Sequence, residues 1–245
     1  MARHSRGRRP SLSLRARDAG VRSPAFDRKP CNSLSMPSAT PPRDVAQLIG
    51  RRDRAFLSLI EEVGPPPARR GAPTAQRFPT LIRTITHQLL ATRAAATIHG
   101  RVHALCHEDI SVESILAVGA EALRSAGLNR TKALAMIELA EHVREGRVQL
   151  DRHGRMSDDD IVRDLTVVRG IGPWTAHMYL MHTLGRADVW PVGDYGVRNG
   201  WSVVHAMDET IGATALREQG GCFAGHRSSV AWYCWRAVDL QRAAK

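Results

Sequence analysis

The chain has 245 residues and a mass of 27.0 kDa, with 43% hydrophobic and 24% charged residues, which is the composition of a globular protein able to bury a core. It has neither an apolar run of about 18 residues nor an apolar segment near the N-terminus, which excludes a membrane-spanning chain and argues against a secretory signal. Its four cysteines form no CxxC pair, so we expect reduced thiols and a cytoplasmic protein.

The formal net charge of +11 is unevenly distributed along the chain. Residues 1–43 hold ten basic and two acidic side chains, whereas residues 44–245 hold 25 basic and 22 acidic ones. The first segment is rich in Arg, Ser and Pro, so we expect a disordered basic tail over 1–43 and one folded domain over 44–245. The tail could attract DNA phosphates non-specifically or be an artefact of start-site choice, because Met36 begins a plausible shorter chain. An organellar transit segment is a third alternative.

From Asp44 onward, apolar residues recur at helical spacing, and no alternating strand pattern or internal repeat occurs. The pattern therefore predicts an all-α protein. Asn129 and Ser157 each stand where they would cap the following helix, and Gly146 stands just past a helix end. The predicted helices cover residues 44–62, a segment from Pro79, 92–105, 111–118, 119–125, the segment after Asn129, the segment from Ser157 to about Val168, and a segment from Pro173.

A glycine turn, Gly170-Ile-Gly-Pro173, separates two of these predicted helices. Gly170 and Gly172 have no Cβ, so their N–H groups can approach a phosphate. Pro173 suits the first position of the next helix, whose positive N-terminus adds to the attraction, and Ile171 would fill the gap between the two helices. A turn of this kind alone is more often a plain helix connection. Together with the carboxylate and the aromatic residues downstream of it, the segment is typical of a helix-hairpin-helix, which grips a DNA backbone without reading bases.

A carboxylate, Asp194, lies 22 residues after this turn in the segment Trp190-Pro-Val-Gly-Asp-Tyr-Gly-Val-Arg198. It precedes a helical pattern, so it is either a helix N-cap or a carboxylate held at the mouth of a cleft beside the hairpin. The two interpretations are compatible, because a capping side chain is also rigidly aimed.

The aromatic residues are clustered, since all eight Trp and Tyr residues lie between positions 174 and 235. We expect Trp190 and Trp201 to belong to the core, as clustered aromatics usually do. Trp174 stands in the first turn after the glycine turn, where a bulky indole has little reason to be buried. It is better explained as a stacking surface for a base that has left the DNA helix.

These residues carry a resemblance to a known family. The segment 165–198 resembles the helix-hairpin-helix and Gly/Pro/Asp pattern of the HhH-GPD superfamily of DNA glycosylases, and it is most similar to the 3-methyladenine DNA glycosylase II branch. Three further segments match family elements in the same order, so that the likeness covers residues 75–240. They are the helix pair Phe78–Ala95, the turn Gly127-Leu-Asn-Arg-Thr-Lys-Ala133 and the helix Arg227–Trp235. The resemblance implies a two-lobed all-α fold with the helix-hairpin-helix beside a central cleft.

The resemblance also implies a role for individual positions. Asp194 falls at the family's catalytic carboxylate. Leu89, after Gln88 at a helix corner, falls at the wedge that fills the gap left by a flipped nucleotide. The remaining positions implied are Gly170, Ile171, Gly172 and Thr175 in the phosphate-binding hairpin, which in the family often holds a monovalent cation, and Trp174, Met178 and Trp235 on the walls of the base pocket.

Two departures from the family pattern bear on the chemistry. Trp174 stands where bifunctional relatives carry a catalytic lysine, so no Schiff base can form and strand cleavage loses its nucleophile. The four-cysteine iron–sulfur pattern of other branches is absent, because Cys222 and Cys234 alone cannot supply it. We expect no cofactor apart from the hairpin cation. Gly225-His226 also stands where relatives tend to have a proline followed by an aromatic residue.

The implied function is hydrolysis of the N-glycosidic bond of alkylated purines, such as 3-methyladenine and 7-methylguanine, in double-stranded DNA. We expect a monofunctional enzyme that acts as a monomer, without AP-lyase activity. Two alternatives remain: a non-catalytic helix-hairpin-helix protein that binds DNA or senses damage, and a glycosylase of the same fold for another damaged base.

Two weaker signals concern metal and phosphate binding. His103, Cys106 and His107 lie close in sequence on a predicted helix, but Cys106 and His107 point to different faces and a fourth ligand is missing, so we expect no metal site. Arg130 and Lys132 are either phosphate contacts or part of a solvated face.

Overall fold

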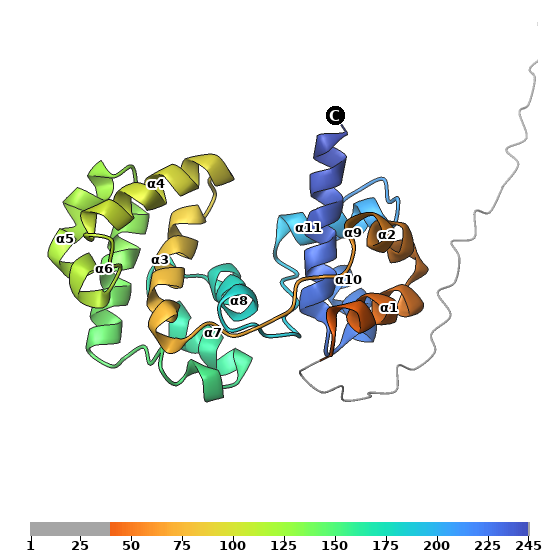
Figure 1. Ribbon diagram of the computed structural model, residues 1–245, viewed down its shortest axis with the longest axis horizontal. Helices are drawn as coiled ribbons and strands as arrows, with labels where there is room; N and C mark the ends of the chain where they lie inside the picture. Colours follow the sequence, from red (N-terminus) through yellow and green to blue (C-terminus); the bar gives the residue numbers. More distant parts are fainter. Residues whose placement is uncertain (1–39, 245) are drawn as a thin grey trace, which may run out of the picture. The chain divides into compact units, whose positions relative to one another are not determined.

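The computed structural model describes residues 40–244, so that all but the last four residues of the predicted basic tail lie outside the described part. Within this range every regular element is a helix, as predicted, and no helix there has the length and apolar character needed to cross a bilayer. The helices are α1 (Pro42–Arg52), α2 (Leu57–Val63), α3 (Arg77–His87), α4 (Thr92–Leu105), α5 (Val112–Ser125), α6 (Arg130–Arg144), α7 (Asp158–Thr166), α8 (Pro173–His182), α9 (Tyr195–Val204), α10 (Ala213–Gln219) and α11 (Arg227–Ala243). Figure 1 shows their order.

The predicted helix boundaries that depend on local chemistry are confirmed. The side chain of Asn129 accepts a hydrogen bond from the backbone N–H of Lys132, and Ser157 caps α7 in the same way through Asp160. The predicted division between residues 118 and 119 is also present, because Gly119 interrupts α5 with a φ of +73°.

The prediction of one helix over residues 44–62 is wrong, and the structure shows the cause. Asp53 has extended backbone angles and ends α1, and its side chain accepts a hydrogen bond from the N–H of Ala55 at 3.0 Å. The other oxygen of Asp53 lies 2.8 Å from Nε2 of His205 on α9. A short-range cap and a long-range partner together outweigh the helical pattern. The helix expected from Pro79 begins two residues earlier, at Arg77.

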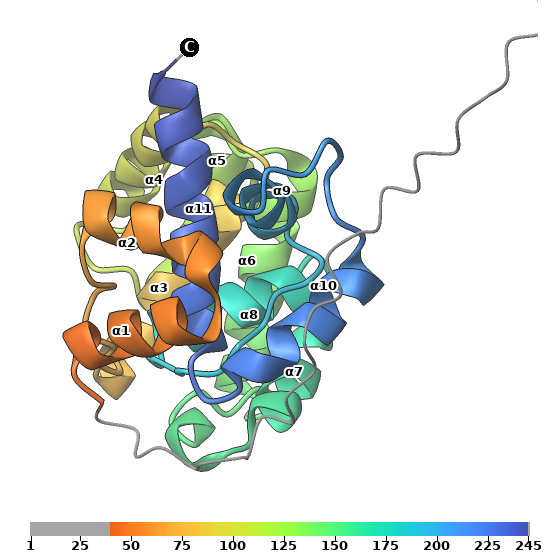
Figure 2. The ribbon, with the colours of Figure 1, turned by 90° about the vertical axis from the view of Figure 1, so that its right-hand side faces the viewer.

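The helices form two groups (Figure 1), which lie one behind the other in the view of Figure 2. One group contains the consecutive helices α3 to α8, in which α3 contacts α4, α6 and α8 and α5 packs along α6. The other group joins α1 and α2 to α9, α10 and α11, with α9 packed along α11. The buried apolar side chains of both groups form one continuous cluster, which includes Trp201 as predicted.

The chain passes between the two groups twice, after α2 and after α8, and the two connecting segments are in contact. The N–H of Ala72 donates to the carbonyl of Thr183 at 2.7 Å. A Cβ on Gly185 would lie 2.7 Å from the carbonyl carbon of Arg70, so the crossing requires glycine at this position. The two crossings therefore fix the segment that leads from α8 to Asp194.

Candidate active site

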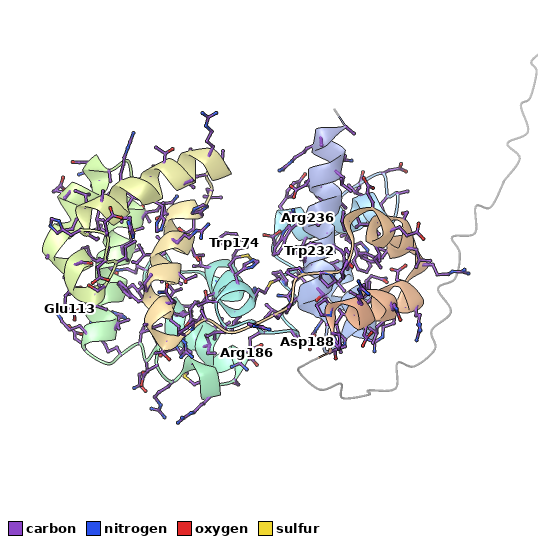
Figure 3. The ribbon with its side chains drawn as sticks, viewed as in Figure 1. Glu113, Trp174, Arg186, Asp188, Trp232 and Arg236 are labelled. Carbon is purple, nitrogen blue, oxygen red and sulfur yellow. The ribbon has the colours of Figure 1, made fainter. Side chains whose placement is uncertain are left out.

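The segment between α8 and α9 is fixed by two arginines before it reaches Asp194. Nε of Arg186 lies 3.1 Å from an oxygen of Asp158, and the same guanidinium donates to the carbonyl of Met156 at 2.8 Å. Asp188 accepts two hydrogen bonds from Arg227 at the start of α11, both at 2.7 Å. Figure 3 labels Arg186 and Asp188 in this segment. The two-bond contact of Arg227 with Asp188 gives a rigid geometry, and Arg186 anchors the segment through the carbonyl of Met156, so the backbone leading to Asp194 is held at two points.

The structure places Asp194 at the N-cap of α9. Oδ1 of Asp194 accepts a hydrogen bond from the backbone N–H of Val197 at 2.7 Å, and the backbone of Asp194 has extended angles. The capping interpretation of the sequence is therefore confirmed. It fixes the rotamer of the carboxylate, because Oδ1 must stay over the first turn of the helix.

Two indoles from different helices also donate to this carboxylate. Nε1 of Trp235 on α11 donates to Oδ1 at 3.0 Å, and Nε1 of Trp174 on α8 donates to Oδ2 at 2.6 Å. Trp174 is 37% exposed and is the second residue of α8. Figure 3 labels it. An ionised carboxylate only accepts hydrogen bonds, and here it has three donors. Three residues predicted for the site, separated by up to 61 positions in the sequence, are thus brought together.

The sequence interpretation missed His182, whose ring stacks on that of Trp235 with centroids 5.8 Å apart and planes at 30°. A signal was present, because Trp174, Met178 and His182 recur at intervals of four residues and so share one face of α8. Met178 lies between the other two and is 7% exposed, as part of the core cluster. This face of α8 therefore reaches one turn beyond Met178, and the base pocket itself stays a prediction.

The glycine turn has the conformation that a helix-hairpin-helix needs. Gly170 has a φ of +91°, and a Cβ there would lie 2.9 Å from Cβ of Ala135 on α6, so both the backbone angle and the packing require glycine. Ile171 is 3% exposed and fills the space between the helices, as predicted. Gly172 is exposed at the N-cap of α8, next to Pro173. The exposed surface of the turn is therefore backbone, at the positive end of a helix.

The predicted wedge corner is joined to this hairpin. Leu89 has a φ of +53° and its exposed fraction is 103%, the value of a fully extended side chain in solvent. Nε2 of the preceding Gln88 donates to the carbonyl of Gly170 at 3.1 Å and to Oγ1 of Thr175 at 2.8 Å. Thr175 is buried, so its side chain supports the corner and is not presented to solvent.

The hairpin carbonyls bear on the predicted monovalent cation. The carbonyl of Val168 accepts from the N–H of Ile171 at 3.0 Å, and that of Gly170 accepts from Gln88. A carbonyl oxygen has two lone pairs, so each could also coordinate a cation. The cation stays a prediction.

The structure describes the residues of two weaker sequence signals. Lys132 is 7% exposed, so it neither lies on a solvated face nor presents its ammonium to a phosphate at the surface. Arg130 is exposed, so both interpretations stay open for it. His103 lies 2.7 Å from Glu108, and Cys106 is buried. Among residues 40–244 no group of three His, Cys, Asp or Glu side chains is placed to hold a metal ion.

Comparison with known proteins decides the family. Residues 82–221, more than half of the chain, match the family described as "HhH-GPD superfamily base excision DNA repair protein". The chain belongs to this HhH-GPD superfamily. The matched residues contain Leu89, the turn Gly170–Pro173 and Asp194, whereas Trp235 lies outside them.

Individual relatives agree with this assignment. DNA-3-methyladenine glycosylase 1 of Schizosaccharomyces pombe is 27% identical over 191 residues, which cover 77% of this chain and 84% of that protein. The solved S. pombe 3-methyladenine DNA glycosylase Mag1, in complex with abasic DNA, superimposes with a TM-score of 0.73 at 26% identity, over 79% of this chain and 95% of its own. A DNA-3-methyladenine glycosidase from Bacillus halodurans gives 0.69 at 30% identity, over 81% and 91%. The all-α HhH-GPD fold predicted from the sequence is confirmed.

Proposed function

We propose that this chain is a monofunctional DNA glycosylase that hydrolyses the N-glycosidic bond of alkylated purines in double-stranded DNA. The observation that carries the proposal is the carboxylate of Asp194, held by two indole N–H groups and a helix N-terminus next to a phosphate-binding hairpin. The similar proteins named above are 3-methyladenine glycosylases, and one of them was solved with abasic DNA. A helix-hairpin-helix protein that only binds DNA has no need of such a carboxylate.

The indoles account for a preference for alkylated bases. A purine alkylated at N3 or N7 carries a positive charge, and the face of an indole attracts a cation by about 0.5–2 kcal/mol, depending on desolvation. Removing the base from the stack costs a few kcal/mol, and less when alkylation has already weakened its pairing. The exposed indole of Trp174 and the indole of Trp235 would offer this attraction to a base that has left the helix.

The two oxygens of Asp194 would have different tasks in the reaction. Oδ1 accepts both the N–H of Val197 and the indole of Trp235, which fixes the carboxylate. Oδ2 accepts only from Trp174 among the hydrogen bonds of the described residues, and that contact is at the surface. We assign Oδ2 to the sugar. As the bond to the charged base breaks, Oδ2 would stabilise the oxocarbenium-like sugar and orient or deprotonate the attacking water.

The placement of lysines supports the absence of AP-lyase activity. The chain has three lysines, of which only Lys132 lies in the described range. Its Nζ donates to the carbonyls of Thr86 and Gln88, so it is not a free amine. Trp174, at the position where bifunctional relatives carry lysine, cannot form a Schiff base.

The test is the release of free bases from methylated duplex DNA, measured by chromatography, with strand nicking followed in parallel. Wild-type protein should release 3-methyladenine and 7-methylguanine without nicking, and Asp194→Asn should lower release by about 10²–10⁴-fold while DNA binding survives. Binding without release of any base would favour the non-catalytic alternative. Release of a different damaged base would keep the fold-level assignment and correct the substrate.

A further inference from the structure

A buried lysine holds the corner that carries Leu89. Lys132 lies in the first turn of α6 and is 7% exposed, and its Nζ donates to the carbonyl of Thr86 at 2.9 Å and to the carbonyl of Gln88. Helix α3 ends at His87, so these carbonyls belong to its unsatisfied C-terminal end, where a cation is favourable. Burial lowers the pKa of Lys132 below its usual value. Burying the ammonium of a lysine costs free energy, so we ask what Lys132 does at this corner.

The corner itself is unfavourable without support. Leu89 adopts a left-handed backbone conformation, which is strained for a residue other than glycine, and it leaves its whole side chain in solvent. Nothing in the contacts of Leu89 explains this conformation in the free protein. The corner is instead held through the preceding residue, Gln88. The backbone carbonyl of Gln88 accepts a hydrogen bond from Lys132, and its side chain donates to Gly170 and Thr175.

We propose that Lys132 is a positioning residue for DNA distortion: its ammonium fixes the α3 corner so that Leu89 already stands in its inserting conformation before DNA arrives. This inference rests on the proposed function, because it takes Leu89 as the wedge. Lys132 then acts through Leu89 and not by touching a phosphate. Since Gln88 also joins the corner to the hairpin, the wedge and the backbone grip form one rigid unit, and the ordering of the exposed leucine is completed during folding instead of during DNA binding.

The experiment measures insertion without any bond cleavage. A duplex carries 2-aminopurine beside a tetrahydrofuran abasic analogue, and its fluorescence reports unstacking when saturating full-length protein inserts the wedge. Lys132→Met keeps the apolar stem and removes the ammonium, and it should lower the insertion equilibrium about 10-fold. Lys132→Arg keeps the charge and should retain more insertion than Lys132→Met. Arg144→Met removes one exposed positive charge from the other end of α6 and should leave insertion unchanged.

A double-mutant cycle separates positioning from other roles. In a Leu89→Ala background, Lys132→Met should change insertion less than about twofold, because the side chain through which it acts has been removed. Undiminished insertion by a folded Lys132→Met protein would overturn the proposal, and so would an equal loss with and without Leu89. If Lys132→Met fails to fold, as judged by circular dichroism, the comparison of Lys132→Arg in the two backgrounds decides in the same way. The probe duplex contains no damaged base to excise, so it tests insertion without catalysis. A failure of the proposed function would appear in the base-release assay, whereas a failure of this inference would appear in the insertion assay.

Discussion

Replacing Gly196 by alanine should damage catalysis while leaving the fold intact. Gly196 is the second residue of α9, and a Cβ built on it would lie 3.0 Å from Cδ1 and 3.2 Å from Nε1 of Trp235 and 3.1 Å from Oδ1 of Asp194. The methyl group would therefore stand beside the hydrogen bond that joins this indole to this carboxylate. Carbon atoms in favourable contact are about 3.5–4.0 Å apart, so the two side chains must retreat by several tenths of an ångström.

The expected loss follows from that retreat. The Nε1–Oδ1 distance of 3.0 Å would stretch to the edge of hydrogen-bond geometry. A hydrogen bond to a charged group contributes about 1.5–3 kcal/mol, and each 1.36 kcal/mol is a factor of ten in rate, so base release should fall about 10- to 100-fold. Alanine is favoured over glycine in a helix interior by about 0.5–1 kcal/mol, which offsets part of the strain. The free energy of unfolding should fall by about 0.5–2.5 kcal/mol, because the same hydrogen bond is lost and the helix preference for alanine offsets only part of it.

The assay compares single-turnover release of 7-methylguanine with urea unfolding for the same proteins. Gly100→Ala is the matched control, because Gly100 lies within helix α4 and a Cβ there would meet nothing within 4 Å. The control should gain stability and keep full activity. Wild-type rates for Gly196→Ala would refute the reasoning, since they would mean that the position of the Asp194 carboxylate relative to Trp235 does not limit the reaction.

Two further predictions concern stability. A Cβ on Gly200 would lie 1.9 Å from the carbonyl oxygen of Cys234, so Gly200→Ala should force α9 away from α11. The free energy of unfolding, measured by urea titration, should fall by about 3 kcal/mol or more. An unchanged urea midpoint would contradict this packing. The second prediction concerns the pH dependence of stability. Burial disfavours the charged ring of His205, but its hydrogen bonds to Asp53 and to the carbonyl of Trp201 outweigh burial and raise its pKa. Burial would raise the pKa of Asp53, but its hydrogen bond with His205 helps to lower it. The contribution of His205 is complete below its ordinary value of 6.5 and is lost as the pH rises through the raised pKa, and that of Asp53 is lost as the pH falls through its lowered pKa. His205→Gln should therefore destabilise the protein by about 1.5–3 kcal/mol near pH 5.5 and by less near pH 9, and a loss that does not depend on pH would contradict the ion pair.

Features that depend on neighbouring residues were readable from the sequence. Asn129, Ser157 and Asp194 cap the helices that follow them, because a short acceptor side chain satisfies free N–H groups two or three positions away. The hairpin was predicted from local residues too, since Gly170 and Gly172 lack a Cβ and Pro173 suits a helix start, and Gly170 proves to have a positive φ. Local chemistry thus predicted where these three helices begin and that Asp194 lies at a helix N-terminus.

Features that depend on distant partners were not readable. Asp53 breaks a helical pattern because His205, 152 positions away, holds its second oxygen. Lys132 seemed a surface residue because nothing nearby in sequence reveals that the end of α3 covers it with two carbonyl acceptors. His182 joins the candidate site only through Trp235 on another helix. In each case the deciding contact crosses between helices, and periodicity carries no information on which helix faces which.

The contacts of Asp194 also separate aiming from reaction, under the proposed function. Oδ1 is held by a backbone N–H and by the half-buried Trp235, so its orientation is fixed before DNA binds. Among the described residues, Oδ2 is held only by the exposed indole of Trp174. A hydrogen bond in contact with water has a small net free energy, because water can replace either partner. A sugar that becomes cationic can therefore displace the Trp174 N–H from Oδ2 at little cost. The freed indole then remains at the site, where its face can attract the charged base that is leaving.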